Sequence, residues 1–99
     1  MSFTVTNYPL FHLSEKHYQA EVALSVLICF GNQTEKKTLK PQAAELRKAY
    51  VEGNPELNLF DSVAEILQRY ISEYGALSEL LESYLKRTPE LLNKVYSNN

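Results

Sequence analysis

Cysteine, glycine and tryptophan are scarce in this sequence, whose 99 residues include one cysteine, three glycines and no tryptophan. The single cysteine, Cys29, cannot form a disulfide within one chain, whereas small secreted domains usually depend on several. The longest apolar run, residues 22–30, is interrupted by Ser25. It is shorter than the roughly 20 residues that a membrane-spanning helix needs. We therefore expect a soluble, cytoplasmic protein in which residues 1–99 form a single domain.

The residues that carry most enzyme and metal chemistry are also few. The two histidines, His12 and His17, match no zinc-ligand spacing together with Cys29. Cys29 follows Leu27 and Ile28, and apolar surroundings would leave its thiol buried and unreactive. The glycines are far apart, so the sequence contains no glycine-rich phosphate loop. The sequence therefore predicts a protein that is not an enzyme and that needs no metal, cofactor or small-molecule substrate.

Charge is unevenly distributed along the chain, whose net charge is −2. Residues 1–51 contain six basic and four acidic side chains, whereas residues 52–99 contain eight acidic and four basic ones. This difference would favour head-to-tail self-association, although Coulomb energies of this size are small. The basic residues that gather in one segment are Lys36, Lys37, Lys40, Arg47 and Lys48. Because such a patch can contact phosphates, a nucleic-acid accessory protein is the alternative function.

An apolar stripe at helical spacing dominates the second half of the chain. Steps of three, four or seven residues place its members on one face of a helix; they are Val63, Leu67, Tyr70, Tyr74, Leu77, Leu81, Tyr84 and Leu85. Asp61 or Ser62 would cap this helix, and Ser62 with Glu65 has the form of a capping box. Since the stripe keeps its phase across Gly75, we expect one continuous helix over residues 62–87. That glycine would cost the helix about 1 kcal/mol relative to alanine.

Residues 14–30 fit two secondary structures. Ser14 and Gly31 are typical of the residues that flank a helix. The segment after Glu21 is apolar on all sides, as in a buried helix. However, every second residue from 18 to 30 is apolar, as in a strand. We expect a central buried helix; the alternative is an α+β fold in which a hairpin of residues 3–30 packs on C-terminal helices.

The remaining segments predict short helices and loops. Residues 32–40 are polar and form a predicted loop, after which Pro41 suits the first position of a helix over residues 41–52. Residues 53–55, with the sequence Gly-Asn-Pro, end that helix. Thr88 would cap a last helix over residues 89–96. With residues 1–13 extended or irregular and residues 97–99 frayed, the sequence predicts a mostly α protein, a small bundle of three to five helices.

The length of the predicted 62–87 helix indicates a function in protein binding. It would extend about 39 Å, whereas the radius of gyration of a domain of this size is about 13 Å. Part of its stripe would then need cover from another chain. Tyrosine is enriched at protein interfaces, although it also suits the margin of a core. We therefore expect a non-enzymatic regulator, inhibitor, immunity-type protein or adaptor that forms a homodimer or binds a protein partner through Tyr70, Tyr74, Leu77, Leu81 and Tyr84.

Overall fold

A computed structural model describes residues 15–54 and 56–97 of the chain. In these ranges the chain forms five α-helices and one short 3₁₀-helix, and no strand: α2 (Glu15–Cys29), α3 (Gln33–Val51), α4 (Leu59–Tyr74), α5 (Glu79–Tyr84), η2 (Leu85–Arg87) and α6 (Pro89–Ser97). The predicted small helical bundle is confirmed. Residues 15–29 are helical, so this part of the alternative hairpin does not form, and residues 3–14 lie outside the described ranges.

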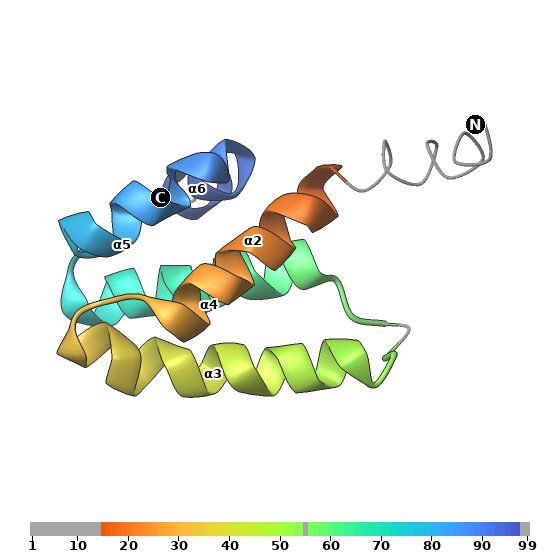
Figure 1. The fold of residues 1–99 in the computed structure, drawn as a ribbon. Helices are drawn as coiled ribbons and strands as arrows, with labels where there is room; N and C mark the ends of the chain where they lie inside the picture. The colour runs from red at the N-terminus through yellow and green to blue at the C-terminus, as the bar shows by residue number, and fades with distance from the viewer. Residues whose placement is uncertain (1–14, 55, 98–99) are drawn as a thin grey trace, which may run out of the picture.

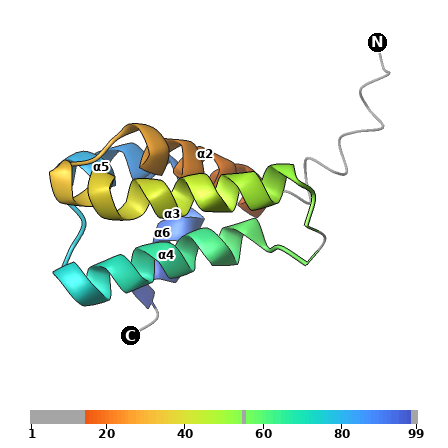
Figure 2. The ribbon, with the colours of Figure 1, turned by 90° about the horizontal axis from the view of Figure 1, so that it is seen from below.

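α2 lies at the centre of the arrangement (Figure 1). It packs against α3, α4 and α6, and α4 also packs against α3 and α6. The view from below shows α3 and α4 side by side (Figure 2). Leucine dominates the core: the largest fully buried apolar side chains are Leu27, Leu39, Leu67, Leu81, Leu85, Leu91 and Val63. Fully burying one such side chain stabilises the fold by about 1.5–3 kcal/mol.

A tight connection joins α2 to α3. Gly31 has a φ of +133°, and a Cβ placed there would lie 3.0 Å from the Cβ of Glu35. The next residue, Asn32, accepts a hydrogen bond from the N–H of Glu35, and the Glu35 carboxylate accepts one from the N–H of Asn32. This capping box starts α3 at Gln33.

The prediction of a loop over residues 32–40 is therefore wrong, because α3 already begins at Gln33. Pro41 lies inside the helix instead of at its first position. A proline there removes one hydrogen bond and crowds the preceding turn. Leu39 and Ala43, on either side of it, are fully buried, and their packing holds this stretch in the helix.

The prediction of one continuous helix over residues 62–87 is also wrong. α4 starts at Leu59, where the side chain of Asn58 accepts from the N–H of Asp61, so neither Asp61 nor Ser62 is the cap. It ends at Tyr74, and Gly75 follows with a φ of +99°, which glycine adopts without strain. Ser78 then caps α5 by accepting from the N–H of Leu81. The stripe keeps its phase because both helices face the same core.

Two buried polar side chains attach the C-terminal helices to α2 and α3. The Glu35 carboxylate accepts from the N–H and the hydroxyl of Ser78, both at 2.7 Å. Gln19 of α2 accepts from the N–H groups of Glu90 and Leu91, at 2.9 and 3.3 Å. Each bond satisfies donors at the first turn of a helix, which have no partner within that helix.

Gln19 therefore caps α6, the role that the sequence indicated for Thr88. Thr88 is fully buried and its hydroxyl donates to the carbonyl of Leu85. The predicted boundaries of this last helix, residues 89–96, agree with the observed Pro89–Ser97 to within one residue. Its cap could not be predicted because Gln19 lies far away in the sequence.

Candidate functional site

The structure divides the five residues that were expected to bind a partner. Tyr70, Leu77 and Leu81 are buried in the core and offer no surface to another chain. Tyr74 and Tyr84 are 47% and 39% exposed. The stripe is therefore covered within this chain over most of its length, and the expected overhang is absent because α4 has 16 residues and stops at Gly75.

The two exposed tyrosines have their rings against other aromatic rings of the same chain. Tyr74 stacks on Tyr70 with ring centroids 4.6 Å apart. Tyr84 stacks on Phe30, at the end of α2, with centroids 3.9 Å apart. Such pairs stabilise a fold by about 0.5–1.5 kcal/mol beyond the area that they bury. These contacts support a role for both tyrosines at the margin of the core.

Cys29 is exposed, so the prediction of a core cysteine is wrong. It is the last residue of α2 and lies on the side of that helix that faces solvent. His12 lies outside the described residues, and among those described no group of three or more His, Cys, Asp or Glu side chains could hold a metal ion. No helix in the same ranges has the length and hydropathy needed to cross a membrane.

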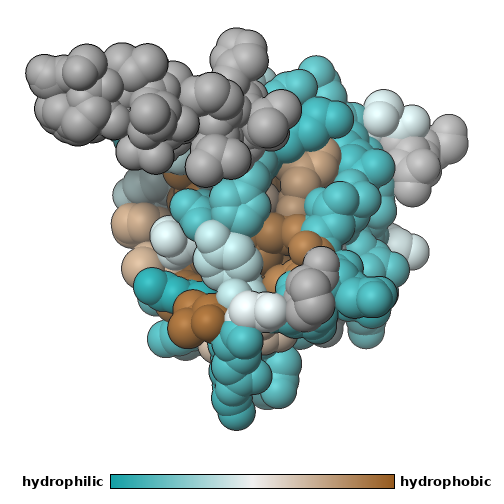
Figure 3. Space-filling model, turned by 90° about the vertical axis from the view of Figure 1, so that its right-hand side faces the viewer, coloured by the Kyte–Doolittle hydropathy of each residue, from teal (hydrophilic) through white to brown (hydrophobic). Residues whose placement is uncertain are grey.

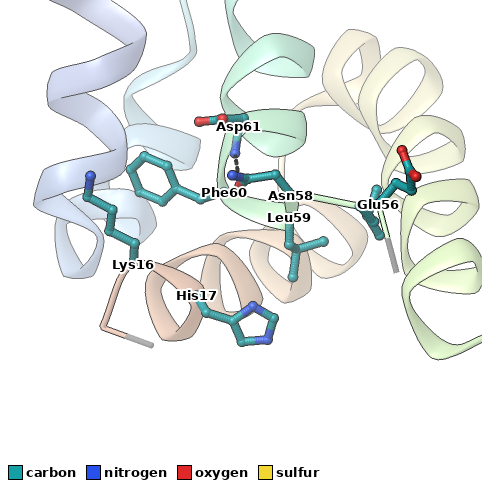
Figure 4. A pocket seen from close by; sticks show the side chains of 8 residues that line it. Lys16, His17, Glu56, Asn58, Leu59, Phe60 and Asp61 are labelled. Atoms are coloured by element: carbon teal, nitrogen blue, oxygen red, sulfur yellow. Dashed lines mark hydrogen bonds between the residues drawn. The ribbon is translucent and has the colours of Figure 1, made fainter. Parts of the chain in front are cut away.

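An open cleft of about 600 Å³ lies at one end of the bundle (Figure 4). Lys16 and His17 of α2 form one wall, and residues 56–61 form the other. Figure 3 views this end and shows hydrophobic side chains at the bottom of a hollow bordered by hydrophilic ones. The charged ends of Lys16, Glu56 and Asp61 point in different directions in Figure 4. These three charged groups of the cleft are therefore not directed toward one another.

A polar cluster beside this cleft ties the start of α2 to the end of α3. The Tyr50 hydroxyl donates to the Glu21 carboxylate at 2.6 Å. His17 Nε2 lies 2.8 Å from the Tyr50 oxygen and 3.2 Å from Glu21. The hydrogen bond to Glu21, together with burial and the negative charge of Glu21, raises the pKa of Tyr50. The hydrogen bonds of Tyr50 join the two helices.

The five predicted basic residues lie on one face of a single helix. Because α3 includes residues 33–51, all five belong to it, and at 100° per residue they occupy an arc of about 120°. From Lys36 to Lys48 this face is about 18 Å long. All five are exposed, and within the described ranges none forms an ion pair with a carboxylate at 4 Å or less. Glu45 lies on another side of the helix.

This basic face borders a groove between α2 and α3, which we call the α2–α3 groove. It consists of two hollows, of about 250 and 460 Å³, and both are lined by Arg47 and Val51. Val51 is 72% exposed. α2 contributes Leu24 and Ser25 to the smaller hollow and Ile28 to the larger one. Glu21 also lines the smaller hollow, and Lys48 and Glu52 line the larger one. The groove thus has an apolar floor, and Arg47 and Lys48 at its rim adjoin the basic face of α3.

The outward side of α2 extends this apolar surface. Tyr18 is 61% exposed, and Val22 and Ile28 are partly exposed. From Val22 to its end at Cys29 the helix carries no charged side chain. The sequence already indicated an apolar outward side, because the segment after Glu21 is apolar on all sides. We interpreted that pattern as complete burial, but α3, α4 and α6 cover part of the helix circumference and leave one side open.

Comparison with family models, with curated proteins and with solved structures gave no match for this chain.

Proposed function

We propose that this protein is a non-enzymatic protein-binding module that docks an acidic, amphipathic helix of a partner protein in the α2–α3 groove. One observation carries the proposal: an exposed, uncharged side of α2 lies beside basic residues of α3 that have no acidic partner among the described residues. Exposed apolar surface bordered by polar residues is typical of interaction sites. Amphipathic helices commonly bind in grooves of this kind.

The apolar floor supplies the part of the affinity that does not depend on salt. Ile28, Ala44 and Val51 contact water in the free protein, and a bound helix would remove that area from solvent. Apolar area contributes about 25 cal/mol per Å² removed from water. A partner must therefore present apolar side chains at helical spacing.

The basic rim decides which apolar helix is accepted. A helix with carboxylates along its flank would place them near Arg47, Lys48 and Lys40, whereas a basic helix would be repelled. Such complementarity mainly increases the association rate and the specificity. The partner is therefore acidic as well as amphipathic.

A nucleic acid would use the same rim but not the floor. Its phosphates could contact the basic face of α3, yet an apolar groove offers nothing to a phosphate backbone. The chain as a whole is acidic, with a net charge of −2. A protein partner uses both features of the groove, and this favours it over a nucleic acid.

The test uses a synthetic helical peptide of 16 residues with leucines on one face and glutamates on the flanks. Its binding to the protein is measured by fluorescence anisotropy. We expect saturable binding that weakens as salt is raised, and loss of at least about tenfold in affinity for Val51→Glu or Arg47→Glu. Leu80→Glu is the matched control, because Leu80 is 48% exposed but lies on α5, away from the groove. The Leu80→Glu variant should bind the peptide with the same affinity as the unmodified protein.

Three results would overturn the proposal. The first is equal binding of a peptide with lysines in place of the glutamates. The second is a dimer in light scattering that Val51→Glu dissociates, which would assign the groove to a second copy of this chain. The third is salt-sensitive binding of duplex DNA that is lost when Lys36, Lys37 and Lys40 become alanine but is unchanged in Val51→Glu.

A further inference from the structure

The two ends of the α2–α3 groove differ in charge. At one end, which we call the junction end, residues 30–32 join α2 to α3 (Figure 1). The exposed charged side chains of α3 near this end are all basic: Lys36, Lys37 and Lys40. Glu35, the acid of the same stretch, is buried and accepts hydrogen bonds from Ser78. Because α2 carries no charge over residues 22–29, the junction end is positive.

The opposite end of the groove, which we call the far end, combines charges of both signs. Arg47 and Lys48 line the larger hollow together with Glu52. Arg47 also lines the smaller hollow, where Glu21 contributes a second carboxylate. Glu21 accepts a hydrogen bond from Tyr50, which leaves its negative charge in place. Two cations and two carboxylates cancel, so the far end has no net charge from these side chains.

The backbone dipoles of α2 and α3 leave this difference unchanged. A helix carries about half a positive elementary charge at its N-terminus and about half a negative one at its C-terminus. Since α2 ends at Cys29, α3 begins at Gln33 and the two helices pack together, the C-terminus of α2 lies beside the N-terminus of α3. Their partial charges offset each other, and the side chains decide the sign at each end.

The lysines of the junction end lie on the same face of α3 as the groove. Lys40 is one turn before Ala44, and Lys36 is 15 residues before Val51, about 22 Å along the helix axis. At 100° per residue, Lys36, Lys37 and Lys40 all lie within about 60° of Val51. A bound helix of 16 residues is about 24 Å long, so it would extend from Val51 to Lys36.

We infer that the partner helix binds antiparallel to α3, with its C-terminus at the junction end and its N-terminus at the far end. The partial negative charge of its C-terminus then lies beside Lys36 and Lys37, and its positive N-terminus lies nearer to Glu21 and Glu52. The reverse orientation would place the positive N-terminus against the lysines. The inference rests on the proposed function and adds a direction to it.

Cys29 reports the orientation, because it is the one cysteine of the chain and is exposed at the junction end. Two versions of the 16-residue peptide used above carry a chloroacetylated lysine as the first or the last residue, with both termini blocked. The Cys29 thiolate displaces chloride from a group held near it and forms a thioether. We expect the peptide labelled at its last residue to alkylate Cys29 about tenfold faster, measured by mass spectrometry.

Reversing the charge of two lysines tests the cause of the preference. Lys36→Glu combined with Lys37→Glu makes the junction end negative, so the tenfold difference in rate should disappear or change sign. Lys86→Glu combined with Arg87→Glu is the matched control. These two exposed cations are also adjacent in the sequence, but they lie on η2, which does not pack against α3. The control variant should keep the tenfold difference, and Cys29→Ser should give no product.

The outcomes separate the inference from the proposed function. Faster alkylation by the peptide labelled at its first residue, or equal rates from two peptides that both bind, would overturn the orientation and leave the proposed function in place. A tenfold difference that survives the reversal of Lys36 and Lys37 would overturn the assigned role of these lysines. Absence of binding by both peptides in fluorescence anisotropy would instead overturn the proposed function, and the orientation with it.

Discussion

α2 has one side packed against α4 and α6 and an opposite side in contact with solvent, although both sides carry similar residues. The packed side buries Ala23 and Leu27, and its one large polar side chain, Gln19, is hydrogen-bonded to α6. The open side presents Tyr18, Val22 and Cys29. The comparison shows that cover from other helices, more than the residues of α2 themselves, separates core from surface here. Substitutions on the two sides should therefore have very different consequences.

The largest difference is expected between Leu27→Ala and Cys29→Ser. Leu27 is fully buried, so its truncation leaves a cavity and should lower the free energy of unfolding by about 2–5 kcal/mol. Cys29 is exposed only two residues away, and its replacement should change that free energy by about 0.5 kcal/mol or less. Urea denaturation followed by circular dichroism measures both. Similar losses for the two variants would mean that the open side of α2 is covered in solution.

A smaller difference is expected between two glutamates of α3. Glu35→Ala removes the acceptor for the N–H groups of Asn32 and Ser78 and should cost about 1–3 kcal/mol. Glu45→Ala, on the exposed side of the same helix, should cost about 0.5 kcal/mol or less. Hydrogen exchange at the Ser78 amide should accelerate in the first variant and not in the second. Unchanged exchange in Glu35→Ala would show that this bond does not hold α5 in place.

The smallest effects concern two tyrosines that donate to glutamates, one on each side of α2. Burial and the hydrogen bond to Glu82 raise the pKa of Tyr96 to about 12, and the bond to Glu21 raises that of Tyr50. A tyrosine is neutral below its pKa, and the ordinary value is about 10. Its stabilising contribution is therefore complete below pH 10 and is lost as the pH rises through about 12 in the case of Tyr96.

Ultraviolet titration of the phenolate absorbance tests this pair. Glu82→Gln should lower the pKa of Tyr96, and Glu21→Gln should lower that of Tyr50, because each variant removes the negative charge that disfavours the phenolate. Tyr96→Phe and Tyr50→Phe assign the two transitions. If neither glutamine variant changes the titration curve relative to that of the unmodified protein, the two tyrosines do not donate to these glutamates in solution.

The sequence predicts the helical class because its local signals are strong. The apolar stripe, the Gly-Asn-Pro stop after α3 and the Pro89 restart each depend on neighbouring residues, and all three correspond to observed features. The break at Gly75 was missed because a stripe that continues in phase is compatible with two helices facing one core. The caps from Glu35 to Ser78 and from Gln19 to α6 join distant segments, which periodicity does not reveal.

The candidate site was only partly predictable for a related reason. The basic residues were identified, but their alignment on one face required α3 to begin at Gln33 instead of Pro41. Ile28 and Val51 were not singled out, because an exposed apolar residue and a buried one look the same in a sequence. We expected the apolar stripe to bind a partner because we assumed a single long helix over residues 62–87. The turn at Gly75 shows that this assumption was wrong.

The two polar bridges also constrain the order in which this chain can assemble. Glu35 and Ser78 are 43 residues apart, and Gln19 and Glu90 are 71 apart. On a ribosome, the α2–α3 pair would emerge long before its last partners have been synthesised. The leucines that α5 and α6 will cover would meanwhile be open to chaperones or to other nascent chains. We therefore expect folding to finish only after residues 89–97 have left the ribosome, with the docking of α6 as its late step.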